Sequence, residues 1–469
     1  MRQDFYIISC LVIYFGVLLL FSIRSCSRIH TFSDYVMGGR SLSPLLCAMN
    51  AGASDMSSWL MMGLPGAFFL YGMNQIWIVI GLILGSWFSW KIIAKRLRVE
   101  TEALDDAVTI PMFLERRFND KSGILRVVCS AMIIIFFAIY IASCLVGGAK
   151  LFSEILDLSY INALLISTVL IIGYACIGGF LAISWADLLQ GTLMLIAILI
   201  VPCLMLGDMF GRVDVWHVLQ SKEGFLNPFN TSAIGILSSL AWGLGYFGQP
   251  HIVSKYMAIK NPNDLSLSRI ICTSWMSIAM IGAVVVGLLG SVFFMDKELT
   301  VAENVFILSS YLLSHPIIFS ITITAVLAAI MSTINGQLII CSSLLVEDFY
   351  KKYFRINASQ KELIFVSRLS VVLVTAIAFF IATDNNSSIL WLVAHAWAGL
   401  GASLGPVTLF ALYSKTITKN AALAGVLSGG FGSMFFAYYQ IFPYELLPAF
   451  MLSVAVILFV SRRNKSCLI

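Results

Sequence analysis

Charge is the scarcest property of this sequence. Of its 469 residues only 11% are Asp, Glu, Lys or Arg, while 59% are hydrophobic. A soluble globular protein carries about 25% charged residues, so the composition excludes a soluble multidomain enzyme and indicates a chain with lipid as its solvent. The formal net charge of +5 does not indicate a nucleic-acid partner, because no basic stretch is interleaved with solvent-facing aromatic residues.

Clusters of cysteine and histidine are also missing. The ten cysteines are scattered without a C-x-x-C pair, which argues against a disulfide framework and a zinc site. The five histidines form no close pair. A membrane redox or haem enzyme would need such pairs, so we expect a protein that is not an enzyme and has no resident cofactor.

Long apolar runs, in contrast, are abundant. A helix that crosses a bilayer needs about 20 mostly apolar residues, and thirteen segments meet this requirement. They cover residues 5–23, 44–70, 74–94, 127–149, 160–181, 188–207, 231–254, 270–294, 317–346, 363–382, 388–413, 420–440 and 445–461. The first is not a cleaved signal peptide, because its positive charges follow the apolar run. The sequence therefore predicts an all-α integral membrane protein with 13 transmembrane helices.

The basic residues sort by side of the membrane. If the N-terminus lies outside, 24 of the 29 Lys and Arg fall in cytoplasmic segments, as the positive-inside rule requires. We therefore expect a multi-pass protein of the cell inner (plasma) membrane with an external N-terminus and a cytoplasmic C-terminus. Lys91, Arg368 and Glu445 lie within a few residues of a span end, and Asp55 is the one charged residue that lies deeper inside a predicted span.

Two spans contain small and polar residues where a membrane helix should be apolar. Residues 50–58 of the second span read NAGASDMSS, and residues 243–250 of the seventh read GLGYFGQP. Unwound backbone is tolerated in a membrane only where protein or a watery cavity satisfies it, so both spans are predicted to be broken helices. Paired interruptions in two halves of a chain indicate the binding site of a transporter.

Counting from these interruptions divides the chain into a 5+5 inverted repeat. Because five is odd, the second set of helices begins on the opposite side of the membrane. The predicted parts are an accessory helix with its loop (1–43), repeat one (44–211), repeat two (231–413), and two last helices with a short tail (414–469). Glycines that merely permit close helix packing are the alternative explanation.

Asp55 needs a compensating partner, since a carboxylate at mid-membrane costs roughly 2.5 to 3.5 kcal/mol. With no basic residue deep inside a span, the candidates are a bound metal ion, a substrate ammonium group, a proton or a helix N-terminus. A protonated, purely structural Asp55 is the alternative.

The ninth span offers oxygen ligands. Ala329, Ser332 and Thr333 have i, i+3, i+4 spacing, which brings one carbonyl and two hydroxyls together on a helix. Small hard cations prefer several oxygen ligands, and unwound carbonyls at Ala53 and Met56 could complete the shell. Membrane Ser and Thr also bond their own i−4 carbonyls, so spacing alone does not identify Na⁺.

Aromatic residues could form the wall of a solute pocket. Tyr140, Trp242 and Tyr246 each combine an apolar ring with a hydroxyl or N–H group, which suits a small cyclic or aliphatic solute. With 13% aromatic residues in the chain, most such side chains face lipid or pack between helices. The pattern alone does not assign these three.

The interrupted segments resemble the sodium/solute symporter family, most closely its proline-transporting branch. The resemblance is carried by residues 51–57, 62–67, 178–187, 243–251 and 331–333. It implies the leucine-transporter fold and electrogenic uptake of L-proline with Na⁺ by alternating access. The alternative is symport of another amino acid, pantothenate or a sugar with Na⁺ or H⁺. Two positions depart from the pattern, with Ser58 in place of a glycine and Ala186 in place of a threonine.

The resemblance also implies roles for single residues, and L-proline, Na⁺ and the lipid bilayer as partners. The residues implied to ligate Na⁺ are Ala53, Met56, Ala329, Ser332 and Thr333, with Asp55 essential for coupling. The residues implied to shape the proline pocket are Ser57, Tyr140, Trp242, Tyr246 and Pro250. The residues implied to belong to the cytoplasmic pathway are Arg40 and Asp187.

Overall fold

The structure, a computed structural model, is helical almost throughout. It describes residues 2–26, 32–175, 179–295, 299 and 301–466. Within these ranges one isolated β-bridge joins Leu42 to Ile259. Gly178, which belongs to one of the segments that carry the family resemblance, lies outside the described residues.

The helices follow one another with short connections. The α-helices up to residue 221 are α1 (Arg2–Cys26), α2 (Phe32–Met37), α3 (Pro44–Asp55), α4 (Leu64–Tyr71), α5 (Ile76–Ser89), α6 (Lys95–Ala103), α7 (Ile110–Arg117), α8 (Ile124–Leu156), α9 (Tyr160–Ala175), α10 (Phe180–Met209) and α11 (Val215–Ser221). The later ones are α12 (Ala233–Leu240), α13 (Pro250–Met257), α14 (Leu265–Phe293), α15 (Val305–Leu313), α16 (Pro316–Leu344), α17 (Gln360–Ile381), α18 (Ile389–Tyr413), α19 (Lys419–Tyr439) and α20 (Leu446–Ser466). Short 3₁₀ or π segments are η1 (Gly38–Arg40), η2 (Trp59–Gly63), η3 (Gly72–Gln75), η4 (Trp90–Ala94), η5 (Ala241–Phe247), η6 (Pro262–Asp264), η7 (Ala302–Asn304) and η8 (Leu345–Phe354).

Every predicted span overlaps a helical segment. In the described residues ten helical runs are long and apolar enough to cross a membrane, and three shorter apolar helices accompany them. The prediction of an all-α membrane protein is confirmed, while the count of thirteen crossings stays a prediction. The sixth span begins at Phe180 rather than at residue 188, because the extended backbone of Gly179 (φ −106°, ψ −176°) marks the helix start.

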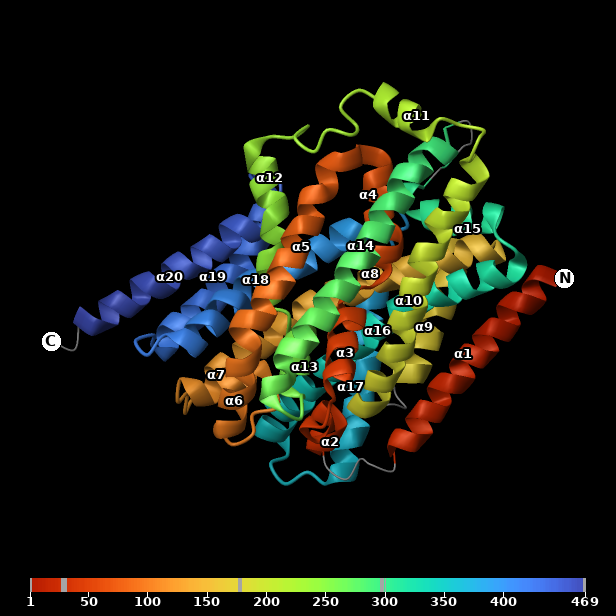
Figure 1. Cartoon of the computed structure of the whole chain (residues 1–469). Coiled ribbons are helices and arrows are strands. Elements are labelled where there is room, and N and C mark those ends of the chain that lie inside the picture. Colours follow the sequence, from red (N-terminus) through yellow and green to blue (C-terminus); the bar gives the residue numbers. More distant parts are fainter. Residues whose placement is uncertain (1, 27–31, 176–178, 296–298, 300, 467–469) are drawn as a thin grey trace.

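The helices form one bundle with peripheral helices on two flanks. Figure 1 shows α1 along one flank and α19 with α20 on the other. α1 packs against α10 and α16, whereas α19 and α20 pack against each other and against α18. The outer face of α1 carries Ile8, Val12 and Ile13, each at least 60% exposed, as a surface that meets lipid requires.

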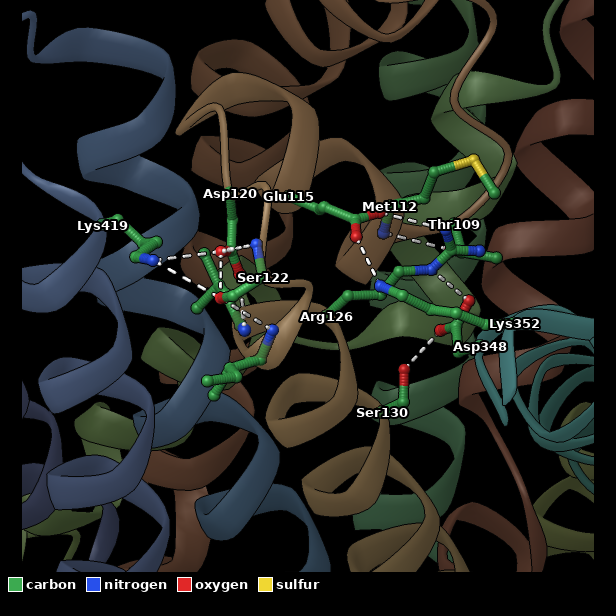
Figure 2. A network of polar contacts seen from close by, with 12 residues as sticks. Thr109, Met112, Glu115, Asp120, Ser122, Arg126, Ser130, Asp348, Lys352 and Lys419 are labelled. Carbon is green, nitrogen blue, oxygen red and sulfur yellow. Dashed lines mark hydrogen bonds and ion pairs between the residues drawn. The ribbon is translucent and has the colours of Figure 1, made fainter. Parts of the chain in front are cut away.

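A network of charges joins helices at the end of the bundle near α7. Arg126 of α8 donates to Asp348 of η8 (2.5 Å) and to Glu115 of α7 (3.0 Å), and Lys352 donates to Glu115 (2.7 Å). Ser130 donates to the buried Asp348 as well (Figure 2). These contacts hold the end of the α16–η8 helix against α7 and α8.

A second cluster in Figure 2 joins the turn between α7 and α8 to α19. The Asp120 carboxylate accepts hydrogen bonds from the Ser122 hydroxyl (2.5 Å), the Leu125 amide (2.9 Å) and the Lys419 ammonium (3.1 Å). Burial alone would raise the pKa of Asp120, but these donors outweigh it and lower the pKa to about 2. The carboxylate therefore remains charged in the folded protein at neutral pH.

Candidate functional site

The second span is broken directly after Asp55. α3 begins at the Ser43 cap with Pro44 in its first turn, and ends because Met56 leaves the helical conformation (φ −87°, ψ 83°). The helix resumes as the π segment η2 at Trp59. The indole Nε1 of Trp59 donates to the carbonyl oxygen of Asp55 (2.9 Å), so protein satisfies part of the broken backbone.

The seventh span is broken at the predicted glycines. α12 passes into the 3₁₀ segment η5, and α13 begins at Pro250. Proline suits the first turn of a helix because its missing N–H has no intrahelical partner there. The two predicted broken helices are therefore present in the structure.

The first break and α16 meet at the predicted cation ligands. The Ser332 hydroxyl oxygen lies 2.8 Å from the Ala53 carbonyl oxygen and 3.0 Å from that of Ala329. The Thr333 hydroxyl is buried without a hydrogen-bond partner in the described part of the chain. Met56 is fully buried beside the break, and its N–H donates to the Gly52 carbonyl (3.1 Å). Carbonyls and hydroxyls thus gather here, and they are suitable donors for a hard monovalent cation.

Asp55 joins the two breaks. Its Oδ2 accepts a hydrogen bond from the Tyr246 hydroxyl of η5 (2.5 Å), and its Oδ1 has no partner among the described residues. The Tyr140 hydroxyl of α8 reaches the Asp55 carbonyl oxygen at 3.4 Å. Asp55 is 1% exposed, so the interior of the bundle holds a carboxylate oxygen that no donor of the described residues compensates.

The predicted pocket residues do not all share one cavity. Trp242 stacks on Tyr444 (ring centroids 4.8 Å apart) and lines a cavity of about 390 Å³. Pro250 lines a different cavity, together with Phe180. Tyr140 and Tyr246 meet at Asp55 between the breaks, and the Ser57 hydroxyl accepts the Trp59 N–H at 3.4 Å.

Trp397 of α18 is a residue at the site that the sequence analysis missed. Its Nε1 donates to the Trp242 carbonyl (2.8 Å), and its ring meets that of Tyr246 edge to face (5.0 Å, 83°). Its own carbonyl accepts from the Gln249 amide (3.1 Å). The side chain of Trp397 therefore contacts η5 at Trp242 and at Tyr246, and its backbone carbonyl contacts Gln249 just after η5. The signal in the sequence was the glycine-rich run 399–405 that follows this tryptophan.

Glycines let η5 lie directly between two helices. A Cβ added to Gly85 of α5 would lie 2.2 Å from the Gly243 carbonyl oxygen, and one added to Gly401 of α18 would lie 2.8 Å from the Gly245 Cα. Both distances are below van der Waals contact. The backbone of η5 is thus clamped between the backbones of α5 and α18.

Arg40 is the centre of a polar cluster at the other end of α3. It donates to Asp106 (2.6 Å), to the Thr101 hydroxyl (3.2 Å) and to the carbonyls of Met257 (2.8 Å) and Ala107 (3.3 Å). Burial lowers the pKa of Arg40, and the neighbouring Asp106 opposes that shift. This end of α3 is therefore attached both to the end of α13 and to the segment after α6.

Asp187 and Lys255 correct the expectation that only Asp55 is charged within the spans. Asp187 lies inside α10 and Lys255 inside α13, and their side chains are 0% and 1% exposed. The Lys255 ammonium lies over the Phe180 ring (4.7 Å). The expectation was wrong because α10 begins earlier, and α13 ends later, than the apolar runs that defined the spans.

Comparisons with known proteins agree with this geometry. A family model described as the sodium:solute symporter family matches residues 35–429. The high-affinity proline transporter PutP of Bacillus subtilis is 44% identical over 95% of both chains. The sodium/proline symporter of Escherichia coli is 42% identical over 96% of this chain and 91% of its own.

Solved structures show the same fold. A Na⁺-coupled sialic acid symporter in a substrate-bound outward-open state has a TM-score of 0.81 at 16% identity, covering 97% of this chain and 98% of the other. Mhp1, a nucleobase-cation-symport-1 family transporter in a closed conformation, has a TM-score of 0.56 at 12% identity over 92% and 95%. The chain is a multi-pass membrane transporter and belongs to the sodium:solute symporter family.

Proposed function

We propose that this protein takes up L-proline together with Na⁺ across the cell's inner (plasma) membrane. Two relatives named as proline transporters are 44% and 42% identical in sequence to this protein over nearly its whole length. The observation that carries the proposal is the hydrogen bond of 2.5 Å between Tyr246 and Asp55. It joins the two broken spans at a buried carboxylate with one unpartnered oxygen, where a cation and a zwitterion can compensate the charge.

Na⁺ would bind between the first break and α16. The proposed ligands are Ala53, Met56, Ala329, Ser332 and Thr333. The short distances from the Ser332 hydroxyl to two carbonyl oxygens and the unpartnered hydroxyl of Thr333 support this set. Asp55 would act beside the ion, since its carboxylate points to η5.

Proline would bind between the breaks, with Tyr140, Trp242 and Tyr246 around its ring. Ser57 lies at the break itself, while Pro250 begins the helix that follows the second break. We assign Pro250 an indirect role, because it lines a cavity other than that of Trp242. Arg40 and Asp187 would belong to the route by which both ligands leave into the cytoplasm.

Transport would follow alternating access between repeat one (44–211) and repeat two (231–413), with the N-terminus outside and the C-terminus in the cytoplasm. One charge that moves through 100 mV supplies about 2.3 kcal/mol. At roughly 1.4 kcal/mol per tenfold change, the potential alone supports about fortyfold accumulation of proline.

Equilibrium binding to the purified protein tests the substrate. We expect radiolabelled L-proline to bind in NaCl but not in KCl, and only proline-like zwitterions to displace it. Displacement by pantothenate or a sugar, or binding that is equal in both salts, would contradict the proposal.

A further inference from the structure

A basic groove lies where the end of α18 meets η4 and α6. Lys91, Lys95, Arg96, Val99 and Tyr413 are among the residues that line it, and its volume is about 420 Å³. The three cations and Tyr413 are exposed at the surface. In the proposed orientation this groove lies at the cytoplasmic face of the membrane.

The side chains that line the groove are held in place by contacts with uncharged groups. The Arg96 guanidinium lies over the Tyr413 ring (3.9 Å) and donates to the Leu412 carbonyl (3.3 Å). Lys95 donates to the side-chain oxygen of Asn263 (2.9 Å), and Tyr413 donates to the Ile92 carbonyl (2.8 Å). The groove is therefore held in shape by contacts that leave its positive charge in place.

Protein carboxylates do not neutralise the groove. Among the described residues no ion pair includes Lys91, Lys95 or Arg96. Glu100 also lines the groove, but its carboxylate oxygen Oε2 lies 3.7 Å from the guanidinium Nε of Arg117, with which it forms an ion pair. On the same side of the protein, by contrast, Arg126 is paired with carboxylates. Three cations thus face the groove with one shared carboxylate.

The exposed face of α5 continues from the groove as an apolar surface. Leu84 and Phe88 are 48% and 44% exposed, and they precede Lys91 and Lys95 at intervals of three or four residues. Residues so spaced share one face of a helix. The same face therefore changes from apolar side chains to ammonium groups, as the chemistry of a phospholipid changes from acyl chain to headgroup.

We propose that this groove binds the phosphodiester headgroup of an anionic glycerophospholipid from the cytoplasmic leaflet. Lys91, Lys95 and Arg96 would hold the headgroup, and an acyl chain would lie along Leu84 and Phe88. Basic pockets between membrane helices on the cytoplasmic side recognise such headgroups. Because α5 and α18 also clamp η5, a lipid in the groove braces the two helices that support the site.

Lipid binding to the full chain in nanodiscs tests this proposal. The variant K91Q/K95Q is compared with K121Q/K361Q, which loses the same charge from exposed cytoplasmic positions outside the groove. Native mass spectrometry measures retained phosphatidylglycerol as its fraction in a phosphatidylcholine bilayer is raised. We expect about 30-fold weaker retention in K91Q/K95Q, because each cation near a membrane contributes roughly fivefold, and little change in the control.

Three results would overturn the proposal: equal retention in both variants, equal retention of phosphatidylglycerol and phosphatidylcholine by the wild type, or full displacement of the lipid by millimolar glycerol 3-phosphate. The last would assign the groove to a soluble phosphate. Thermal unfolding in pure phosphatidylcholine shows that both variants are folded. The measurement does not involve proline, so its outcome is independent of the proposed transport function.

Discussion

At the residue scale, the central feature is oxygen chemistry in an apolar interior. The Asp55 carboxylate has one oxygen bonded to Tyr246 and one without a partner in the described structure. Nearby, the Ser332 hydroxyl lies within hydrogen-bond distance of two carbonyl oxygens. Groups that protein contacts leave partly satisfied are costly in a membrane, and a bound cation would offset that cost.

Replacement of Ser332 by Ala tests the hydroxyl. An interaction with a charged group is worth about 1.5 to 3 kcal/mol, so the Na⁺ concentration for half-maximal uptake should rise at least about tenfold. Ser342→Ala is the matched control, because Ser342 is buried on the same helix and bonds only its own helix, at the Ile339 carbonyl (3.0 Å). Equal effects of both variants on Na⁺ dependence would argue against Ser332 as a ligand.

At the scale of elements, the clamp on η5 is the critical arrangement. The interrupted segment is a short 3₁₀ helix, and the glycines of α5 and α18 together with Trp397 fix its position. An unwound segment that must hold a solute needs such external support, because its backbone groups would otherwise be unsatisfied in the membrane.

Gly85→Ala should abolish uptake. The added methyl group would lie 2.2 Å from the Gly243 carbonyl oxygen, and backbone atoms cannot move aside as a flexible side chain can. Gly207→Ala is the control, since nothing lies within 4 Å of a Cβ at that position. We expect normal uptake and normal amounts in the membrane for Gly207→Ala, and a loss of uptake confined to Gly85→Ala. Unimpaired proline uptake by Gly85→Ala would contradict the clamp.

Trp397→Phe keeps an aromatic ring against Tyr246 but removes the N–H that bonds the Trp242 carbonyl. The loss of one hydrogen bond, about 1 kcal/mol, should weaken proline binding roughly fivefold, with the Na⁺ requirement retained. Trp216→Phe, which changes an exposed tryptophan of α11 away from the site, should bind proline normally. If equilibrium binding is unchanged in Trp397→Phe, the tryptophan does not position η5.

The breaks could be predicted from the sequence, because small and polar residues at membrane depth have a local physical meaning. The residues that hold the broken segments in place could not be predicted from the sequence. Trp397 contacts residues about 150 positions away in the chain, and Arg126 meets Asp348 across 222 positions. Such pairs arise only from the packing of helices. The burial of Lys255 was missed for a related reason, since apolar runs end before the helices do.

At the scale of the whole molecule, charge clusters connect the bundle to its peripheral helices. Asp120 holds the turn between α7 and α8 to Lys419 at the start of α19 (Figure 2). Other charges join α16 through η8 to α8. The fold is therefore fastened at this end by ion pairs, and through the bundle by apolar contacts.

Acid should reduce the stability that the Asp120 contacts provide. The pKa of Asp120 is about 2 in the folded protein and near 3.9 in an unfolded chain. A lowered folded-state pKa contributes stability that is present above the unfolded value and is lost as the pH falls towards the folded value. The melting temperature of the wild type in detergent should therefore fall more steeply between pH 4 and pH 2 than that of Asp120→Asn. Parallel curves would contradict this role.

The most direct test of the central claim is proline uptake into proteoliposomes, with wild type and Asp55→Asn compared. An imposed inward Na⁺ gradient should drive uptake by the wild type, and an inside-negative potential should increase it, whereas K⁺ or H⁺ gradients should not replace Na⁺. Asp55→Asn should insert in equal amounts and show no Na⁺-dependent uptake. Uptake by Asp55→Asn with an unchanged dependence on Na⁺ would contradict the claim that the joined breaks couple Na⁺ to proline.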